Sequence, residues 1–296
     1  MDRGNRSTVT EFILLGLTND PNIQILLSFF LIVIYTSAFT ANSLLILAVS
    51  FDHRLHNPMY FFIINLSFLN LFSPSITIPK MLEHSLSGKK SISLAGCTSQ
   101  IFFYLLLGQS ECNLLVLMAY DRFVAICKPL RYNMIMDRST CAWMITVIWT
   151  VSSVILTFCN PNIINHFICE IPSLLPLSCS DTSVLDSMRF GGGIVFLLFP
   201  LALILFSYFR IIISITRIHS GRYKAFSTCS SHLIVVTLFY GTAMVLYLRP
   251  RLPVSDNTDK LTSVFYVIFT PVLNPLIYSL RNKDVLRAMR RLVSLL

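Results

Sequence analysis

Long apolar stretches recur along the whole chain, separated by short segments that carry most of the charge. The first, from Pro21 to Phe51, contains no Asp, Glu, Lys, Arg or His and exceeds the roughly 20 residues that cross a hydrocarbon core as a helix. Because lipid offers the backbone no hydrogen-bond partners, each stretch is predicted to be helical. The pattern predicts an all-α membrane protein, a seven-transmembrane helix bundle in a single domain over 1–296. The spans are expected at about 25–49, 58–79, 99–126, 140–158, 190–215, 227–248 and 261–280.

The last residues, 284–296, have a different pattern. Val285, Met289, Leu292 and Leu296 recur at helical spacing, and three arginines occupy the remaining positions around the turn. This predicts a short amphipathic helix after the seventh span, lying on the membrane surface. The alternative is a frayed tail.

Composition and charge agree with a membrane protein and suggest its orientation. The chain is 54% hydrophobic and 12% charged, whereas soluble domains carry about 25% charged residues. The loops on one side, at 52–56, 121–138, 210–224 and 281–296, hold 14 Lys and Arg against 4 acids, and the other side is balanced. The positive-inside rule places the basic side and the C-terminus in the cytoplasm and the N-terminus outside. We therefore expect the basic residues to face the lipid bilayer and an acidic protein partner, with no nucleic acid bound.

Two features of the predicted outer side concern covalent modification. Asn5-Arg6-Ser7 is a glycosylation sequon, with Asn5 as the expected acceptor. Four of the eight cysteines fall at or beyond the outer face, where disulfides persist, and four cysteines allow three pairings. They are Cys97, Cys159, Cys169 and Cys179.

Charged residues within the apolar stretches are candidates for function. Asp121 and Arg122 stand at the end of the third stretch, where an arginine is costly unless a carboxylate or a conformational change gives it a partner. Such a pair can act as a switch, although a snorkelling arginine is the alternative. Glu111 lies eleven residues earlier, about 16 Å along a helix and near the middle of the bilayer. In the seventh stretch, Pro275 removes a backbone donor and is expected to kink the helix one turn before Tyr278.

Several motifs together resemble one receptor family. MAYDRFVAIC ends the third stretch at 118–127, with Phe123 in place of the usual tyrosine, and PMYFF opens the second at 58–62. KAFSTCSSH opens the sixth at 224–232, and PVLNPLIYSLRN closes the seventh at 271–282. In this order they resemble the tetrapod-type (class II) odorant receptors, a branch of the rhodopsin-like G-protein-coupled receptors.

The resemblance implies a plasma-membrane receptor that is not an enzyme. It implies binding of a small, mostly apolar, volatile odorant between the helices and activation of a stimulatory heterotrimeric G protein of the olfactory type, which raises cAMP. A pocket of this kind is mostly apolar with a few orienting polar groups. The implied pocket residues are Tyr104, Leu105, Gly108 and Gln109 in the third span, Gly192 and Phe196 in the fifth, Tyr240, Met244 and Tyr247 in the sixth, and Val264 in the seventh.

The resemblance also assigns roles to other residues. It makes Asp121, Arg122, Tyr208 and Tyr278 the switch that couples to the G protein. It favours a Cys97–Cys169 disulfide, with Cys159–Cys179 closing the following loop on itself. Family members usually pair the Glu111 position with an aspartate, but here that residue is Asn70. A shared ion or proton and a neutral Glu111 hydrogen-bonded to Asn70 are therefore both open.

One departure from the family supports an alternative. Only ten positions separate Trp149 from Cys159, where about twenty are usual, so the fourth helix is shortened. The alternative is a receptor-like chain that folds poorly or does not signal, and a remote one is a small-molecule transporter or channel using Glu111. The chain has no His-Glu-x-x-His run, phosphate-binding glycine loop or nucleophile elbow, so no cofactor and no metal are expected.

Overall fold

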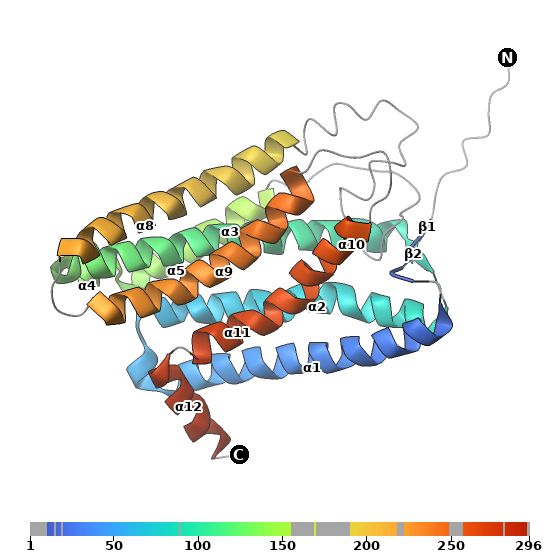
Figure 1. Cartoon of the computed structure of the whole chain (residues 1–296), viewed down its shortest axis with the longest axis horizontal. Helices are drawn as coiled ribbons and strands as arrows, with labels where there is room; N and C mark the ends of the chain where they lie inside the picture. Colours follow the sequence, from blue (N-terminus) through green and yellow to red (C-terminus); the bar gives the residue numbers. More distant parts are fainter. Residues whose placement is uncertain are drawn as a thin grey trace.

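The apolar stretches form helices that run side by side along one long axis in the computed structural model (Figure 1). The structure describes residues 11–14, 16–18, 20–88, 90–154, 169, 190–217, 222–248, 257–280 and 282–294. The long helices are α1 (Pro21–Phe51), α2 (Pro58–Ser87), α3 (Leu94–Cys127), α5 (Arg138–Val154), α8 (Phe199–Arg217) and α9 (Arg222–Leu248). The shorter ones are α4 (Tyr132–Ile135), α10 (Asn257–Val264), α11 (Thr270–Leu280) and α12 (Lys283–Val293).

Short elements join or interrupt these helices. The 3-10 turns η1 (His53–Leu55) and η2 (Pro129–Arg131) follow α1 and α3. The π-helical turns η4 (Ile194–Leu198) and η5 (Phe265–Phe269) lead directly into α8 and α11. Strands β1 (Glu11–Ile13) and β2 (Ser91–Ser93) pair in an antiparallel ladder, with Phe12 opposite Ile92.

Among the described residues, six helical segments are long and apolar enough to cross a membrane. They are Pro21–Phe51, Pro58–Ser87, Leu94–Cys127, Phe190–Arg217, Cys229–Leu248 and Leu261–Ser279. The fourth predicted span, 140–158, coincides with α5, and its residues after 154 lie outside the described part of the chain. The predicted all-α membrane bundle is thereby confirmed.

Helix α1 packs one face against the bundle and exposes its other apolar faces. Asp20 caps its start by accepting the Asn22 and Ile23 N–H groups, and Pro21 occupies the first turn, where its missing N–H has no intrahelical partner to lose. Leu31, Ala38, Asn42, Leu45 and Val49 recur at helical spacing and are buried. The large apolar side chains on the other faces are exposed, as expected of a helix surrounded by lipid.

Helix α2 is longer than the sequence pattern predicts. The second span was expected to end near residue 79, but the helix contains both Pro74 and Pro79 and continues to Ser87. Membrane helices tolerate internal prolines because neighbouring groups satisfy the freed carbonyls. The helix ends at Gly88, whose φ of 68° is the left-handed conformation that favours glycine after a helix.

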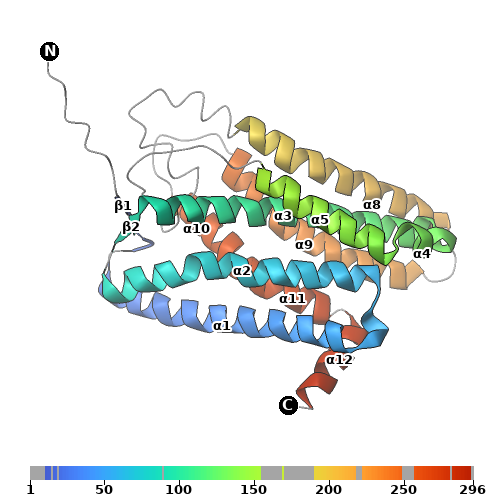
Figure 2. The ribbon, with the colours of Figure 1, turned by 180° about the vertical axis from the view of Figure 1, so that it is seen from behind.

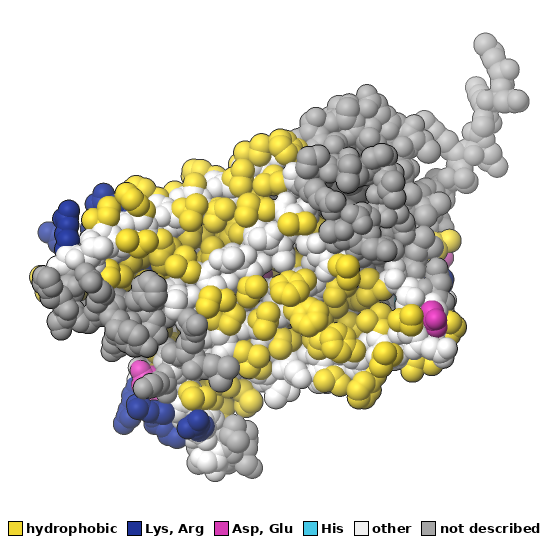
Figure 3. All heavy atoms as spheres, viewed as in Figure 1, with side chains coloured by type: hydrophobic (Ala, Val, Ile, Leu, Met, Phe, Trp, Pro, Cys, Tyr) yellow, Lys and Arg dark blue, Asp and Glu magenta, His cyan; other side chains and the backbone are white. Residues whose placement is uncertain are grey.

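The two ends of the bundle differ in chemistry. Strands β1 and β2 lie at one end, and η1, α4 and α12 lie at the other (Figures 1 and 2). In the face shown in Figure 3, apolar side chains cover the middle and Lys and Arg gather at the α12 end. This distribution is typical of a membrane protein whose apolar middle lies in the hydrocarbon and whose basic end faces lipid headgroups.

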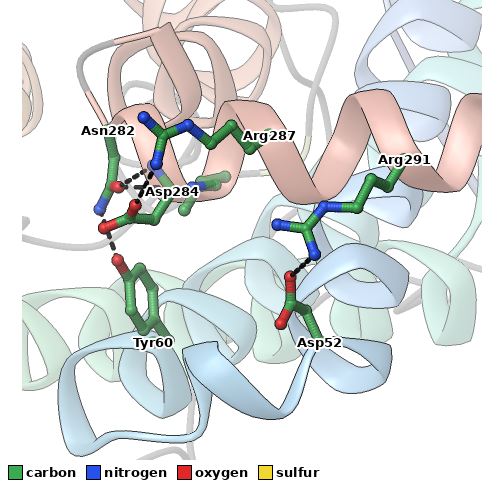
Figure 4. A network of polar contacts seen from close by, with 7 residues as sticks. Asp52, Tyr60, Asn282, Asp284, Arg287 and Arg291 are labelled. Carbon is green, nitrogen blue, oxygen red and sulfur yellow. Dashed lines mark hydrogen bonds and ion pairs between the residues drawn. The ribbon is translucent and has the colours of Figure 1, made fainter.

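Helix α12 is held against the start of the bundle by one apolar and two polar contacts. Val285 and Ala288 are buried against the main core. Asn282 caps the helix and donates from Nδ2 to the Tyr60 hydroxyl at 2.8 Å (Figure 4). Arg291 forms an ion pair with Asp52 at 3.4 Å (Figure 4). The tail is therefore an ordered amphipathic helix up to Val293.

Candidate functional site

A chain of aromatic rings lies where α3, η5 and α9 meet. Tyr104 of α3 meets Tyr266 of η5 edge-on, with ring centres 6.0 Å apart. Phe239 of α9 lies 5.5 Å from the Tyr266 ring and 5.2 Å from the Tyr240 ring. These separations and tilted geometries are those that aromatic quadrupoles favour. The cluster combines apolar ring faces with the hydroxyl groups of its three tyrosines, the chemistry of a site for a small apolar ligand.

Gly108 determines how closely Tyr266 approaches α3. A Cβ atom at Gly108 would lie 3.3 Å from the Tyr266 hydroxyl oxygen, closer than most Cβ contacts. The missing side chain therefore makes room for the phenol against the α3 backbone. Any larger residue at this position must displace Tyr266.

Most of the other candidate pocket residues lie around this cluster or next to it. Tyr247 and Val264 pack against the same apolar group as Tyr104. Met244 packs with Tyr240 in the adjoining main core. The remaining candidates on α3 are half-buried, and Gln109 donates from Nε2 to Asn113 Oδ1 at 3.3 Å on its own helix. These contacts bring the candidates on α3, α9 and α10 into one region. Leu105 lies on the same helix, between Tyr104 and Gly108 in the sequence.

The candidates on the fifth span are arranged differently because of the π-helical turn η4. Phe196 is 37% exposed, whereas its neighbour Leu197 is buried. A π turn adds one residue to the turn and so changes which side chain faces inward. Gly192 is half-buried near Phe196, and a Cβ at Gly193 would lie 3.0 Å from Leu248 of α9. The close approach of the fifth span to α9 thus occurs at Gly193.

Two residues of the aromatic cluster, Tyr266 and Phe239, were not among the sequence candidates. Both belong to motif-poor apolar stretches, where an aromatic residue at helical spacing is equally consistent with lipid contact. The available signal was the glycine at 108, since a small residue within a span permits close approach of a neighbour.

A buried polar group lies deeper in the bundle. Asn274 of α11 donates from Nδ2 to Asn70 Oδ1 at 3.1 Å and to Glu111 Oε1 at 3.4 Å. Asn274 therefore stands between the two residues that the sequence suggested could bond directly. Asn42 of α1 ties the same region together by donating to the Pro271 carbonyl at 2.9 Å, at a turn whose oxygen Pro275 cannot engage.

At the basic end, the Asp121–Arg122 pair is engaged. The Arg122 Nη2 and Asp121 Oδ2 atoms are 3.1 Å apart, and the Asp121 side chain is only 1% exposed. The Tyr132 hydroxyl of α4 donates to Asp121 Oδ1 at 2.7 Å. Burial, reinforced by the nearby Asp121 carboxylate, raises the pKa of the Tyr132 phenol, so Tyr132 keeps its proton and remains a donor at neutral pH. Sequence reasoning missed this third member of the group.

The two candidate switch tyrosines have different environments. Tyr208 of α8 shares a hydrogen bond of 2.8 Å with His232 Nδ1, and the two rings stack at 5.7 Å. This contact joins α8 to α9. Tyr278 of α11 is buried, and within the described residues its hydroxyl has no hydrogen-bond partner. His232 belongs to the sixth-span motif but had no role assigned from the sequence.

Cys97 and Cys169 form a disulfide, the pair that the resemblance favoured. The Cys169 N–H also donates to Gln100 Oε1 at 3.0 Å, and Phe12 and Leu14 pack beside the two cysteines. The other expected disulfide, Cys159–Cys179, and the Asn5 sequon lie outside the described residues. In the part of the chain that is described, no three His, Cys, Asp or Glu side chains gather as metal ligands do.

The sequence is similar to one known protein family over most of its length. Residues 31–295 match the family model described as "Olfactory receptor". The chain is 47% identical to human olfactory receptor 10A7 over 302 positions, covering 98% of this chain and 96% of that protein. It is 48% identical to mouse olfactory receptor 9G19 over 305 positions, covering 99% of this chain and 100% of the relative. Both alignments are longer than the 296 residues of this chain, so the relatives contain residues that it lacks.

Proposed function

Because the chain belongs to the olfactory receptor family, whose members are receptors and not enzymes, we propose that it binds a small apolar odorant and activates a stimulatory olfactory-type G protein. The odorant acts by binding more tightly to the active arrangement of the helices than to the resting one. The observation that carries this proposal is the aromatic cluster of Tyr104, Tyr266, Phe239 and Tyr240, described above. It combines apolar area with polar tips, as small-molecule sites do.

The contacts at the basic end support the coupling half of the proposal. Asp121 holds Arg122 in the resting state, and Tyr132 keeps Asp121 in place. When the helices part at this end, Arg122 is released to meet the G protein. Leu130 in η2, next to this group, is fully exposed, although it is a large apolar residue, and it gives the G protein an apolar contact beside the basic ones.

The proposal is tested by measuring cAMP in cells that express the full chain while a mixed panel of odorants is applied. Surface staining in parallel shows whether the chain reaches the membrane. At least one odorant is expected to raise cAMP in a dose-dependent way. Abundant surface protein, with cAMP equal to that of cells lacking the chain both without odorant and across the whole panel, would contradict the proposal.

Gly108→Val should raise the odorant concentration needed for a half-maximal cAMP response at least tenfold. The added side chain enters the space now taken by the Tyr266 hydroxyl, 3.3 Å from the Cβ position, and displaces that ring. Gly241→Val is the matched control, because it costs the same in helix propensity but its Cβ would meet nothing within 4 Å. Equal potencies for the two variants, measured from odorant dose–response curves at matched surface levels, would remove Gly108 from the site.

The proposal includes an orientation, with the N-terminus outside and the α12 end in the cytoplasm of the plasma membrane. The 14 basic residues against 4 acids on the loops of that end support it. An N-terminal epitope tag should therefore stain on unpermeabilised cells and a C-terminal tag should not. The same orientation exposes the Asn5 sequon to glycosylation, so Asn5→Gln should abolish the mass shift that glycosidase treatment causes. Staining of the C-terminal tag alone would reverse the orientation.

A second candidate is a chain that folds poorly because its fourth helix is short. The observation that favours it is that the matched relatives contribute residues this chain lacks, together with the ten positions from Trp149 to Cys159. The 140–158 stretch is about 28 Å long as a helix, close to the roughly 30 Å of hydrocarbon. Inserting a ten-residue segment typical of the family between these two residues should raise surface expression, measured by flow cytometry. A chain already abundant and responsive at the surface, with no gain on insertion, would show that the short helix is harmless.

A further inference from the structure

A cavity of about 560 Å³ lies at the α12 end of the bundle, between the α1–α2 connection and the start of α5. The α1–α2 connection and the start of α5 lie at the same end of the bundle in Figure 2. The floor of the cavity is apolar and includes Val49 of α1, Ile64 of α2 and Cys141 of α5. Ala142 completes the α5 side, and because Cys141 and Ala142 are small, they leave space that longer side chains would fill.

The mouth of the cavity is polar. It is formed by His56 and Asn57 before α2, and by Asn133, Asp137 and Arg138 around the start of α5. The Asp137 carboxylate is engaged in capping α5, where it accepts the Thr140 N–H at 3.1 Å. Among the described residues, Arg138 forms no ion pair, and its side chain is exposed. The mouth therefore offers an available cation and two amides to an acceptor group.

The cavity continues toward the surface that faces lipid. Phe61, which lines it, is 37% exposed, and Trp143 on the adjoining turn of α5 is 68% exposed. A molecule that fits this site is thus a long apolar chain entering from the bilayer, with a hydrogen-bond acceptor at the level of the loops. A phospholipid has this construction.

We propose that this cavity, called the groove from here on, binds an acidic phospholipid of the cytoplasmic leaflet. One acyl chain lies on the floor between α2 and α5, and the phosphate lies beside Arg138. The leaflet named here rests on the proposed orientation. The acidic class follows from charge complementarity, because the loops at this end hold 14 basic residues against 4 acids. Basic pockets between membrane helices on the cytoplasmic side bind acidic headgroups for this reason. None of the residues that line the site belongs to the aromatic cluster, to the Asp121–Arg122 pair or to α12.

The test uses the full chain in phosphatidylcholine nanodiscs that contain a trace of phosphatidylserine with a photoreactive diazirine on one acyl chain. Phosphatidylcholine with the same acyl chain is the headgroup control. After irradiation, the labelled peptides are mapped by mass spectrometry. The serine lipid should label the peptides around Phe61–Ile64 and Cys141–Ala142 about fivefold more than the choline lipid, the factor expected for one cation near the surface.

Three variants make the test specific, and all change exposed residues. Arg138→Gln should lower labelling by the serine lipid to the level of the choline lipid. Ala142→Trp should occupy the α5 side of the groove and remove labelling by both lipids at these peptides. Arg287→Gln, which removes an exposed arginine at the same end but not in the groove, should have no effect.

Equal labelling by the two lipids would overturn the proposal, because it would indicate ordinary contact with surrounding lipid. An equal loss in Arg138→Gln and Arg287→Gln would also overturn it, in favour of diffuse attraction. If cholesterol displaced the probe and Arg138→Gln left labelling by the serine lipid unchanged, the groove would be assigned to a sterol instead. Nanodiscs expose both faces and require no odorant, so each of these results is independent of the proposed orientation and receptor function.

Discussion

Replacing Arg122 with alanine is expected to reduce odorant-evoked cAMP to background while surface expression stays close to that of the unmodified chain. The Arg122 Nη2 atom now lies 3.1 Å from the carboxylate of Asp121, its neighbour on α3, so this ion pair does not join α3 to another helix. Its proposed task begins when that pair opens and the arginine meets the G protein. Loss of the arginine therefore removes coupling and leaves the bundle intact. The measurement is cAMP at surface levels matched by staining.

Two further variants distinguish a switch from a general loss of structure. Asp121→Asn should raise cAMP without odorant, because it frees Arg122 from its resting partner while keeping the hydrogen-bond acceptor for Tyr132. Lys80→Ala alters a surface ion pair with Glu83 at the opposite end and should leave signalling unchanged. A normal odorant response in the Arg122→Ala variant would contradict the switch, whatever the basal activity of Asp121→Asn.

Cys97→Ser and Cys169→Ser are expected to damage the protein equally and severely. Either substitution removes the same bridge, and loss of a native disulfide costs about 2–5 kcal/mol of stability. The double variant should be little worse than either single one, because the second cysteine has nothing left to contribute. The quantity to measure is the thermal stability of the solubilised chain together with its surface expression.

Gln100→Leu is a useful comparison for the disulfide. It keeps the bridge but removes the side-chain oxygen that accepts the Cys169 N–H at 3.0 Å, so it should cost less than either cysteine variant. Peptide mapping that finds Cys97 linked to Cys179, or a double variant much worse than the singles, would refute the pairing.

Hydropathy predicted where the long helices of the described residues lie, because a bilayer leaves the backbone few choices. The second span was expected from residue 58 and the sixth to residue 248, and the structure begins α2 at Pro58 and ends α9 at Leu248. The far end of α2 could not be predicted in this way. Proline ends helices in water, but Pro74 and Pro79 lie inside α2, and the helix stops only where Gly88 adopts a positive φ.

The candidate site was harder to predict because it depends on contacts between segments distant in sequence. The family resemblance named Tyr104, Gly108 and Tyr240 as candidates but not Tyr266, whose place follows from a π turn. The same effect in η4 leaves Phe196 partly exposed and Leu197 buried, a change that a regular helical period cannot anticipate. Tyr132 was missed because its partner Asp121 lies eleven residues away, across the loop that returns α4 to the end of α3.

The β1–β2 ladder has a consequence for the order in which the chain is assembled. Strand β1 is synthesised before α1, and its partner β2 only after α2, so two membrane crossings separate them. Phe12 and Leu14 consequently have no apolar cover until both helices are inserted and the Cys97 region arrives beside them. If only one of α1 and α2 crossed the membrane, the two strands would be left on opposite sides of it. The β1–β2 ladder can therefore close only after α1 and α2 have both crossed the membrane.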